Sequence, residues 1–150
     1  RARLGAAFTF GADVVIDISG KRDDGVVAEV RSLAPPDGVD AVIEVCGIPD
    51  VVPAGLKMLR VGGRYTRGGI VPRDANVMID ANLFVKKWVT LKGIHNYHPR
   101  HLIQALDFVV ANRDRFPFKD IVDSKFKLDD LNEAFQRAAE RSVLRAAVVP

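Results

Sequence analysis

Residues 39–47 read Val-Asp-Ala-Val-Ile-Glu-Val-Cys-Gly, and residues 64–69 read Arg-Tyr-Thr-Arg-Gly-Gly. Each segment is typical of a strand that ends in glycine, and the residues between them have the apolar spacing of a helix. Two strands joined by one helix indicate a βαβ unit, in which the strands are parallel and the crossover is right-handed. Such sheets bind ligands at the carboxyl ends of their strands, where glycine lets a ligand approach the backbone closely.

The composition indicates a globular protein. The chain has 150 residues, of which 48% are hydrophobic and 27% are charged, enough for a sizeable core. No apolar stretch reaches the roughly 20 residues of a membrane-spanning helix, and the single cysteine excludes an internal disulfide and a thiolate zinc cluster in this chain. The net charge of +3 suits a small anionic ligand but is too scattered to indicate nucleic-acid binding. We therefore expect a soluble, cytoplasmic protein without membrane or nucleic-acid partners.

Helices and strands are expected to alternate over most of the chain, which is typical of a parallel sheet covered by helices. The expected strands are residues 13–17, 39–45, 64–67, 88–94, 121–126 and 145–149. The expected helices are residues 1–10, 26–33, 49–61, 83–87, 99–111 and 130–138. Gly11, the Gly62 and Gly63 pair and Asn112 are expected to end helices, and Asp129 is expected to cap the last one.

The reactive side chains fit structural roles better than chemical ones. Cys46 has no partner cysteine, so we expect a small, buried, apolar residue there. Asp40 and Glu44 share one face of a strand but lie about 13 Å apart, too far for an acid and base pair, and we expect Glu44 to be hydrogen-bonded structure. His98 and His101 lack a Cys, Asp or Glu at ligand spacing. The sequence predicts no catalytic residue and no metal ligand in this chain.

Six segments, by their order and spacing, resemble the carboxyl-terminal half of a medium-chain, zinc-type alcohol dehydrogenase. They are residues 10–13, 39–47, 59–64, 68–69, 91–93, and 126–135 together with 145–150. Residues 93–97 are similar to a branch linked with phosphonate breakdown, and the sorbitol and threonine dehydrogenases form another possible branch. The resemblance implies an α/β fold: a partial Rossmann fold, or doubly wound parallel sheet, that lacks its first strands. It assigns residues 1–112 to a partial dinucleotide-binding domain and residues 113–150 to a tail that returns to the catalytic domain.

The resemblance also implies that NAD or NADP lies across the strand ends. The cofactor-binding residues that it carries over by position are Val45, Cys46, Gly47, Gly68, Gly69, Ile94, Asn96 and Arg145. The first three would line the ribose side, and the glycine pair would line the nicotinamide side. Ile94 and Asn96 would present main-chain groups to the carboxamide, and Arg145 would reach the pyrophosphate. The alternatives are turn glycines and a solvated surface arginine, and His95 is a candidate proton shuttle.

In the family, the remaining parts of the site would precede Arg1. They are the glycine fingerprint for the pyrophosphate, the acid that binds the adenosine ribose, and the catalytic domain with its zinc ligands. The absent strands would lie between the strands of Val14 and Val42. We therefore expect a fragment, inactive by itself, of an NAD(P)-dependent dehydrogenase that transfers hydride between an alcohol or polyol substrate and nicotinamide, with zinc bound outside this chain.

Two alternatives remain open. A zinc-free quinone or enoyl reductase of the same superfamily has the same cofactor half, and a non-catalytic nucleotide-binding or assembly module needs no chemistry. In the family, the edge strand of the cofactor domain commonly pairs subunits. Here this strand begins at Thr90 and ends at Ile94, so the resemblance implies a homo-oligomer formed through it.

Overall fold

The computed structural model describes residues 2–69 and 73–150 and divides the chain into two compact units. We call Ile18–Tyr97 the central unit. The terminal unit combines the described residues up to Asp17 with His98–Pro150. Each unit is described by itself, and the predicted domain boundary after residue 112 stays a prediction.

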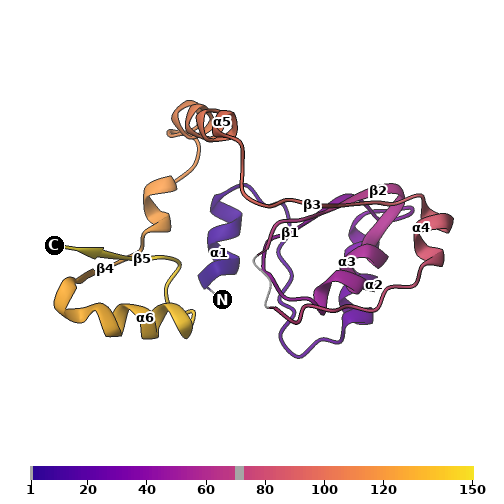
Figure 1. The fold of residues 1–150 in the computed structure, drawn as a ribbon, viewed down its shortest axis with the longest axis horizontal. Coiled ribbons are helices and arrows are strands. Elements are labelled where there is room, and N and C mark those ends of the chain that lie inside the picture. Colours follow the sequence, from indigo (N-terminus) through magenta and orange to yellow (C-terminus); the bar gives the residue numbers. More distant parts are fainter. Residues whose placement is uncertain (1, 70–72) are drawn as a thin grey trace. The chain divides into compact units, whose positions relative to one another are not determined.

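The central unit is a parallel sheet covered by helices (Figure 1). Its strands are β1 (Val39–Glu44), β2 (Leu59–Arg67) and β3 (Thr90–Gly93), in the order β1-β2-β3. Its helices are α2 (Asp23–Leu33), α3 (Val51–Met58), which links β1 to β2, and α4 (Asn82–Lys87), which precedes β3. The predicted α/β class and the βαβ unit are thereby confirmed.

The core of the central unit forms where α3 packs on the sheet. Val52 and Leu56 of α3 and Leu59 and Tyr65 of β2 are buried there. Gly55 allows this packing, because a Cβ atom at that position would lie 2.6 Å from the Tyr65 ring. Burial raises the pKa of Tyr65 to about 12, and the nearby Glu44 charge adds to the rise, so the phenol stays neutral.

The boundary between α3 and β2 differs from the prediction. The helix ends at Met58, and the strand begins at Leu59 rather than after the Gly62 and Gly63 pair. Leu59 is extended, with ψ 143°, and fully buried, so tertiary packing stops the helix there. The glycines instead form an irregularity in the strand: Gly62 has φ +73°, and the pairing register shifts between Val39 and Ala41.

The predicted strand at residues 13–17 is wrong. In the described part of the chain, these residues belong to neither sheet. Val14 is 52% exposed. A run of β-branched residues becomes a strand through pairing with a neighbour, and no described strand pairs with this one.

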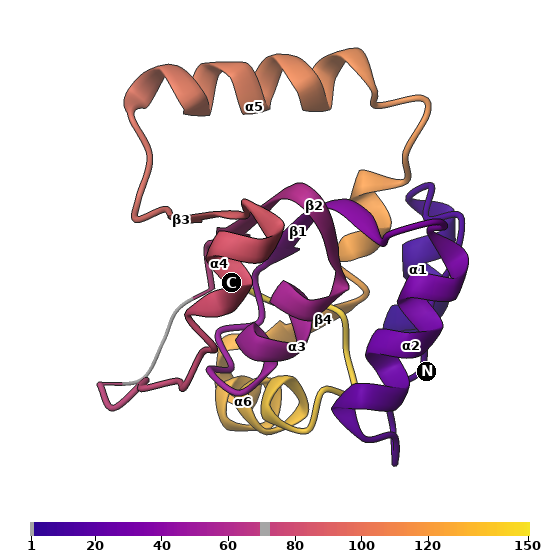
Figure 2. The same ribbon diagram turned by 90° about the vertical axis from the view of Figure 1, so that its right-hand side faces the viewer.

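The terminal unit contains three helices and a two-stranded parallel sheet. Its helices are α1 (Ala2–Thr9), α5 (Pro99–Ala111) and α6 (Leu131–Ala139). Figure 2 shows α5 from the side. Its strands are β4 (Ser124–Lys127) and β5 (Ala146–Val149). Short 3-10 turns, η1 (Phe118–Ile121) and η2 (Leu128–Asp130), flank β4. None of the helices in the described residues is long and apolar enough to cross a membrane.

The ends of these helices agree with the sequence at three places and differ at one. α1 closes before Gly11, which has φ +90°, α5 begins at Pro99, and Asn112 is the C-cap of α5, as predicted. Asp129 is not a cap, because η2 occupies that position and Asp130 precedes α6 without a side-chain capping bond. The predicted strand at residues 121–126 begins only at Ser124, because η1 extends to Ile121.

Candidate functional site

The carboxyl ends of the three central strands lie at one edge of the sheet. In the pairing register, Glu44 at the end of β1 lies opposite Arg67 at the end of β2, and Arg67 lies opposite Gly93 at the end of β3. All predicted cofactor residues of the central unit lie within three residues past these strand ends. The structure thus brings together Val45, Cys46, Gly47, Gly68, Gly69, Ile94 and Asn96.

The two glycine turns after β1 and β2 are in direct contact. The main-chain N–H groups of Gly68 and Gly69 both donate to the carbonyl oxygen of Glu44, at 2.8 and 3.2 Å. A Cβ atom on Gly69 would lie 2.3 Å from the nitrogen of Gly47, and Gly47 itself has φ +72°. Glycine is therefore required for the close approach of these two turns.

The Glu44 carboxylate holds the turn after β1. The residue is 5% exposed, and its Oε1 atom accepts a 2.6 Å hydrogen bond from the Gly47 N–H. The Nε atom of Arg67 lies 3.5 Å from its Oε2 atom. Burial acts to raise the pKa of Glu44, but the bonds from Gly47 and Cys46 and the charge of Arg67 outweigh it and lower that pKa. Glu44 is ionised at neutral pH, and its predicted role as hydrogen-bonded structure is confirmed.

Arg67 is a residue of this edge that the sequence reasoning missed. Its side chain is 19% exposed. The Nη2 atom of Arg67 and the Oε2 atom of Glu44 are buried without a hydrogen-bond partner among the described residues. The feature of the sequence that could have identified Arg67 was a charged residue at the end of a predicted strand, directly before the Gly68 and Gly69 pair.

A hollow of about 560 Å³ lies beside the ends of β2 and β3. It is lined by Arg67, Gly68, Gly69 and residues 93–96. The Ile94 N–H donates to the Arg67 carbonyl at 2.9 Å, and Asn96 has φ +55°. Residues 93–96 are exposed, so this wall of the hollow is open to a ligand.

The prediction that Cys46 is buried is wrong. Cys46 is exposed, because it follows the last paired residue of β1, where the chain leaves the sheet. Cys46 lies close enough to Glu44 to help lower the pKa of that carboxyl, although the Gly47 N–H lowers it more. With Val45, Cys46 lines a second hollow, of about 380 Å³, on the side of the sheet that carries α3.

Arg145 belongs to the terminal unit, where it directly precedes β5. The main-chain N–H groups of Leu144 and Arg145 donate to the two carboxylate oxygens of Asp123, at 3.0 and 3.3 Å. The bond from Leu144 is the largest influence on the Asp123 carboxyl, and with the bond from Arg145 it lowers the pKa of that group. Asp123 thereby fixes the main chain from which the Arg145 side chain extends.

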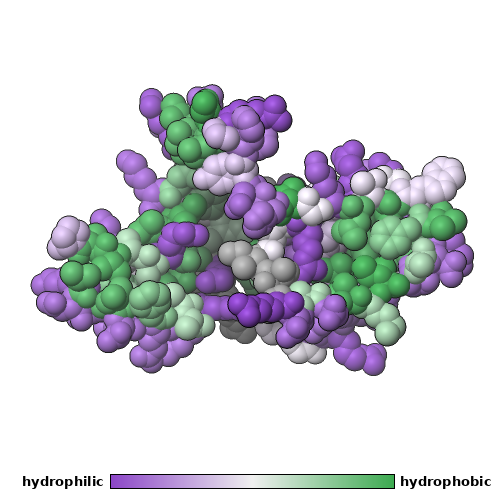
Figure 3. All heavy atoms as spheres, in the orientation of Figure 1, coloured by the Kyte–Doolittle hydropathy of each residue, from purple (hydrophilic) through white to green (hydrophobic). Residues whose placement is uncertain are grey.

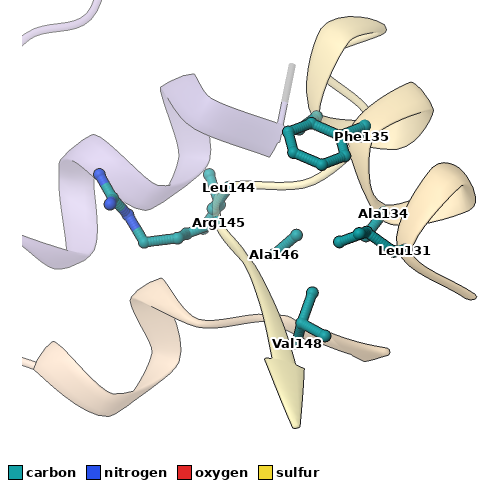
Figure 4. A pocket seen from close by; sticks show the side chains of 8 residues that line it. Leu131, Ala134, Phe135, Leu144, Arg145, Ala146 and Val148 are labelled. Atoms are coloured by element: carbon teal, nitrogen blue, oxygen red, sulfur yellow. The ribbon is translucent and has the colours of Figure 1, made fainter. Parts of the chain in front are cut away.

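Figure 4 shows the Arg145 side chain pointing toward α1 and away from the apolar hollow between α6 and β5. On the α1 side, Arg145 lines a different hollow, of about 380 Å³, together with Arg3. The Nη2 atom of Arg3 lies 3.5 Å from the Val143 carbonyl and donates to it. Arg3 is a second residue that the sequence reasoning missed. Two arginines on one hollow make it suited to an anionic group; that Arg145 joins the central residues around one ligand stays a prediction.

The described residues contain no group of three or more His, Cys, Asp or Glu side chains that could hold a metal ion. His95, the proposed proton shuttle, is exposed on the wall of the hollow beside β3. His98 and His101 belong to the terminal unit, where Nδ1 of His98 accepts from the N–H of Arg100 at the start of α5.

Comparison with known proteins places this geometry in context. A sequence profile described as zinc-binding dehydrogenase matches residues 1–111. L-threonine 3-dehydrogenase from Vibrio vulnificus strain CMCP6 is 30% identical over 137 residues, which cover 89% of this chain and 37% of that enzyme. A probable D-xylulose reductase A from Aspergillus clavatus is 27% identical over 139 residues, covering 91% and 37%.

Solved structures agree with the fold. 2R,3R-butanediol dehydrogenase from Bacillus subtilis is 31% identical and superimposes with a TM-score of 0.79, over 99% of this chain and 41% of that enzyme. An alcohol dehydrogenase from Thermotoga maritima has a TM-score of 0.86 at 23% identity, over 99% and 40%. The chain thus spans about two fifths of the length of the proteins that it matches.

Proposed function

The chain belongs to the zinc-binding dehydrogenase family, and from this premise we propose that it forms part of an NAD(P)-dependent alcohol or polyol dehydrogenase. The observation that carries the proposal is the contact between Gly47 and Gly69 at the ends of two neighbouring parallel strands, beside a hollow that Gly68 and Gly69 line. This is where a doubly wound sheet binds a nucleotide. The names of the related enzymes, which act on threonine, xylulose and butanediol, support a small alcohol or polyol as substrate.

The residues present fit a dinucleotide. Gly68 and Gly69 line the hollow without a side chain, and the buried Nη2 atom of Arg67, which lines the same hollow, has no hydrogen-bond partner among the described atoms. We assign Val45, Cys46 and Gly47 to the ribose side, Gly68 and Gly69 to the nicotinamide side, and main-chain groups of Ile94 and Asn96 to the carboxamide. Arg145 and Arg3, which share one hollow, are suited to phosphate groups.

Binding and orientation are the contribution of this chain. A bound nicotinamide ring would accept a hydride from the alcohol carbon. The glycine turns would keep the backbone close to the ring, and the hydrogen bonds from Gly68 and Gly69 to Glu44 would keep those turns in place before binding. The zinc ligands are proposed to lie outside this chain, so no step of the chemistry is assigned to a residue of it.

A titration of the complete protein with NADH and NADPH tests the proposal. Gly69→Val forces the two glycine turns apart, and Arg145→Ala removes a charge-assisted contact, so each should weaken binding by about tenfold or more. Gly25→Ala is the control, because its side chain would meet no atom within 4 Å in α2. Unchanged affinity in both Gly69→Val and Arg145→Ala would contradict the assigned site, and turnover by the isolated 150 residues would contradict the dependence on other parts of the enzyme.

A zinc-free quinone or enoyl reductase is not favoured, because the matching profile is that of zinc-binding dehydrogenases. Metal analysis of the complete protein distinguishes the two: about one or more zinc ions per subunit are expected from a zinc-type enzyme. The cytoplasmic location stays a prediction from the sequence.

Assembly through β3 is a second proposed property. All four residues of β3 are exposed, and within the described sheet the strand pairs on one side only, with β2. An open strand edge is a template for pairing with another chain. Leu91→Lys should reduce the size of a homo-oligomer in sedimentation experiments, and an unchanged size would exclude this edge as the interface.

A further inference from the structure

Arg67 contacts the ends of all three strands of the central sheet. Its side chain lies beside Glu44 at the end of β1, with 3.5 Å between Nε and Oε2. Its carbonyl oxygen accepts the Ile94 N–H just after β3, at 2.9 Å. Arg67 is the last residue of β2 and directly precedes Gly68 and Gly69. It also lines the hollow at this edge.

Stability alone does not explain a charged pair at this position. Burying an ion pair removes two charges from water, and well-packed apolar residues in its place are often equally stable or more stable. Here the Nη2 atom of Arg67 and the Oε2 atom of Glu44 are also left without hydrogen-bond partners among the described residues. Buried polar atoms without hydrogen-bond partners call for an explanation other than packing.

The contacts of Glu44 supply that explanation. Its carboxylate binds the Gly47 N–H, and its carbonyl oxygen binds the N–H groups of Gly68 and Gly69. Among the described residues, the N–H groups of both glycine turns therefore bond to Glu44, one through its carboxylate and two through its carbonyl oxygen, and the Arg67 guanidinium faces the carboxylate. Cys46 and the neutral Tyr65 are the other titratable groups that interact electrostatically with this carboxylate.

We propose that Arg67 is a positioning residue for the dinucleotide: its guanidinium fixes the Glu44 carboxylate and thereby sets the spacing of the turns at Gly47 and at Gly68 and Gly69. This inference rests on the proposed function. Arg67 acts through Glu44, so it is not itself assigned a contact with the reacting atoms.

The test compares dinucleotide affinity in variants of the complete protein. Arg67→Met, which keeps the length of the side chain but removes its charge, should weaken NADH or NADPH binding by about tenfold. Arg64→Met is the matched control, because Arg64 lies on the same strand but is exposed, and it should bind as the wild type does. In a Glu44→Gln background, Arg67→Met should have no further effect. Unchanged affinity in Arg67→Met would overturn the proposal. So would additive losses of affinity when Arg67→Met and Glu44→Gln are combined.

The pH dependence separates positioning from simple destabilisation. The Gly47 N–H and, to a smaller extent, the charge of Arg67 lower the pKa of Glu44, so removing the Arg67 charge should make dinucleotide affinity fall at a slightly higher pH during acidification than in the wild type. Arg67→Lys, which restores the charge, should restore the wild-type dependence of affinity on pH. If Arg67→Met does not fold, the pH dependence of Arg67→Lys is compared with that of the wild type instead. A loss of affinity in Arg67→Met with an unchanged pH profile would overturn the role through Glu44.

Hydrogen exchange gives a readout that needs no dinucleotide. The amides of Gly47, Gly68 and Gly69 should exchange faster in Arg67→Met than in Arg64→Met, because their acceptor residue is less well held. If the wild type binds neither dinucleotide, the proposed function fails. Faster exchange would still support the positioning role of Arg67, and equal exchange would overturn it.

Discussion

The helices α3 and α5 are both rich in apolar residues, but their environments differ. α3 buries Val52 and Leu56 against the sheet of the central unit. α5 is longer, with 13 residues, yet none of them is buried in the described structure. Leu106, in the middle of its apolar face, is 57% exposed, and Figure 3 shows apolar side chains gathered on the surface of this helix.

The difference shows that an apolar pattern specifies a helix without specifying its packing. α3 lies between two strands of one βαβ unit, so its partners are supplied by the neighbouring sequence. In the described structure, α5 has no buried residue, and its Phe108 joins an aromatic cluster with Phe116 and Phe118. The central unit is thus held by buried contacts, and the terminal unit depends more on exposed ones.

The largest expected difference is between matched leucine truncations in the two helices. Leu56→Ala should lower the free energy of unfolding of the complete protein by about 2–5 kcal/mol, because Leu56 is fully buried. Leu106→Ala should change it by less than about 0.5 kcal/mol, since the side chain is exposed. Urea unfolding of both variants is the measurement. Equal losses would break the comparison and show that the face of α5 is covered in the complete protein.

Glycine substitutions should have opposite signs in the two units. Gly69→Ala should destabilise the complete protein by about 1–3 kcal/mol, because its Cβ atom would lie 2.3 Å from the Gly47 nitrogen. Gly5→Ala in α1 would meet no atom within 4 Å and should stabilise by about 0.5–1 kcal/mol, as alanine favours a helix interior. Thermal unfolding of the two variants checks the signs. A neutral Gly69→Ala would mean that the glycine turns are not held in contact.

Local patterns predicted the elements better than their partners. The βαβ unit was predicted correctly from residues 39–69. The glycines after β1 and β2 correctly marked the edge of the sheet where these strands end. The pairing of Glu44 with Arg67 did not follow, because the irregularity in β2 shifts the register between Val39 and Ala41, and a strand sequence does not reveal such a shift. The exposure of Cys46 was missed for a related reason: it depends on where pairing stops.

The incorrect predictions for the end of α3 and for a strand at residues 13–17 have the same cause. The Gly62 and Gly63 pair is an acceptable helix end by local rules, but burial of Leu59 in the core decides that the strand starts earlier. Residues 13–17 have the composition of a strand and no described neighbour. In both cases a tertiary contact, or its lack among the described residues, outweighs the local preference.

Two carboxylates with lowered pKa values sharpen the comparison further. Glu44 is buried in the central unit, so Glu44→Gln should cost about 1–2 kcal/mol at pH 7 by weakening the bond to the Gly47 N–H and removing the partner of Arg67. The folded state holds the pKa of Glu44 below its ordinary value of about 4.5. The stabilisation is therefore complete above that pH and is lost as the pH falls toward the lowered pKa. Melting temperatures of wild type and variant should converge in acid; a constant difference would contradict this.

Asp123 in the terminal unit provides the smallest effect, because its carboxylate is exposed to water and its interactions are screened. Asp123→Asn replaces one of the two acceptors for the N–H groups of Leu144 and Arg145, so the amides before β5 should exchange faster at pH 7. The bond from Leu144 lowers the pKa of Asp123 below its ordinary value of about 3.8, so this protection is complete above that pH and is lost on further acidification. Hydrogen exchange at Leu144 and Arg145 is the measurement, with the Gly47 amide as internal control. If exchange at Leu144 and Arg145 is unchanged, Asp123 does not fix the main chain of Arg145; if the Gly47 amide also accelerates, the two units are not independent, and the contrast between α3 and α5 must arise from something other than their local partners.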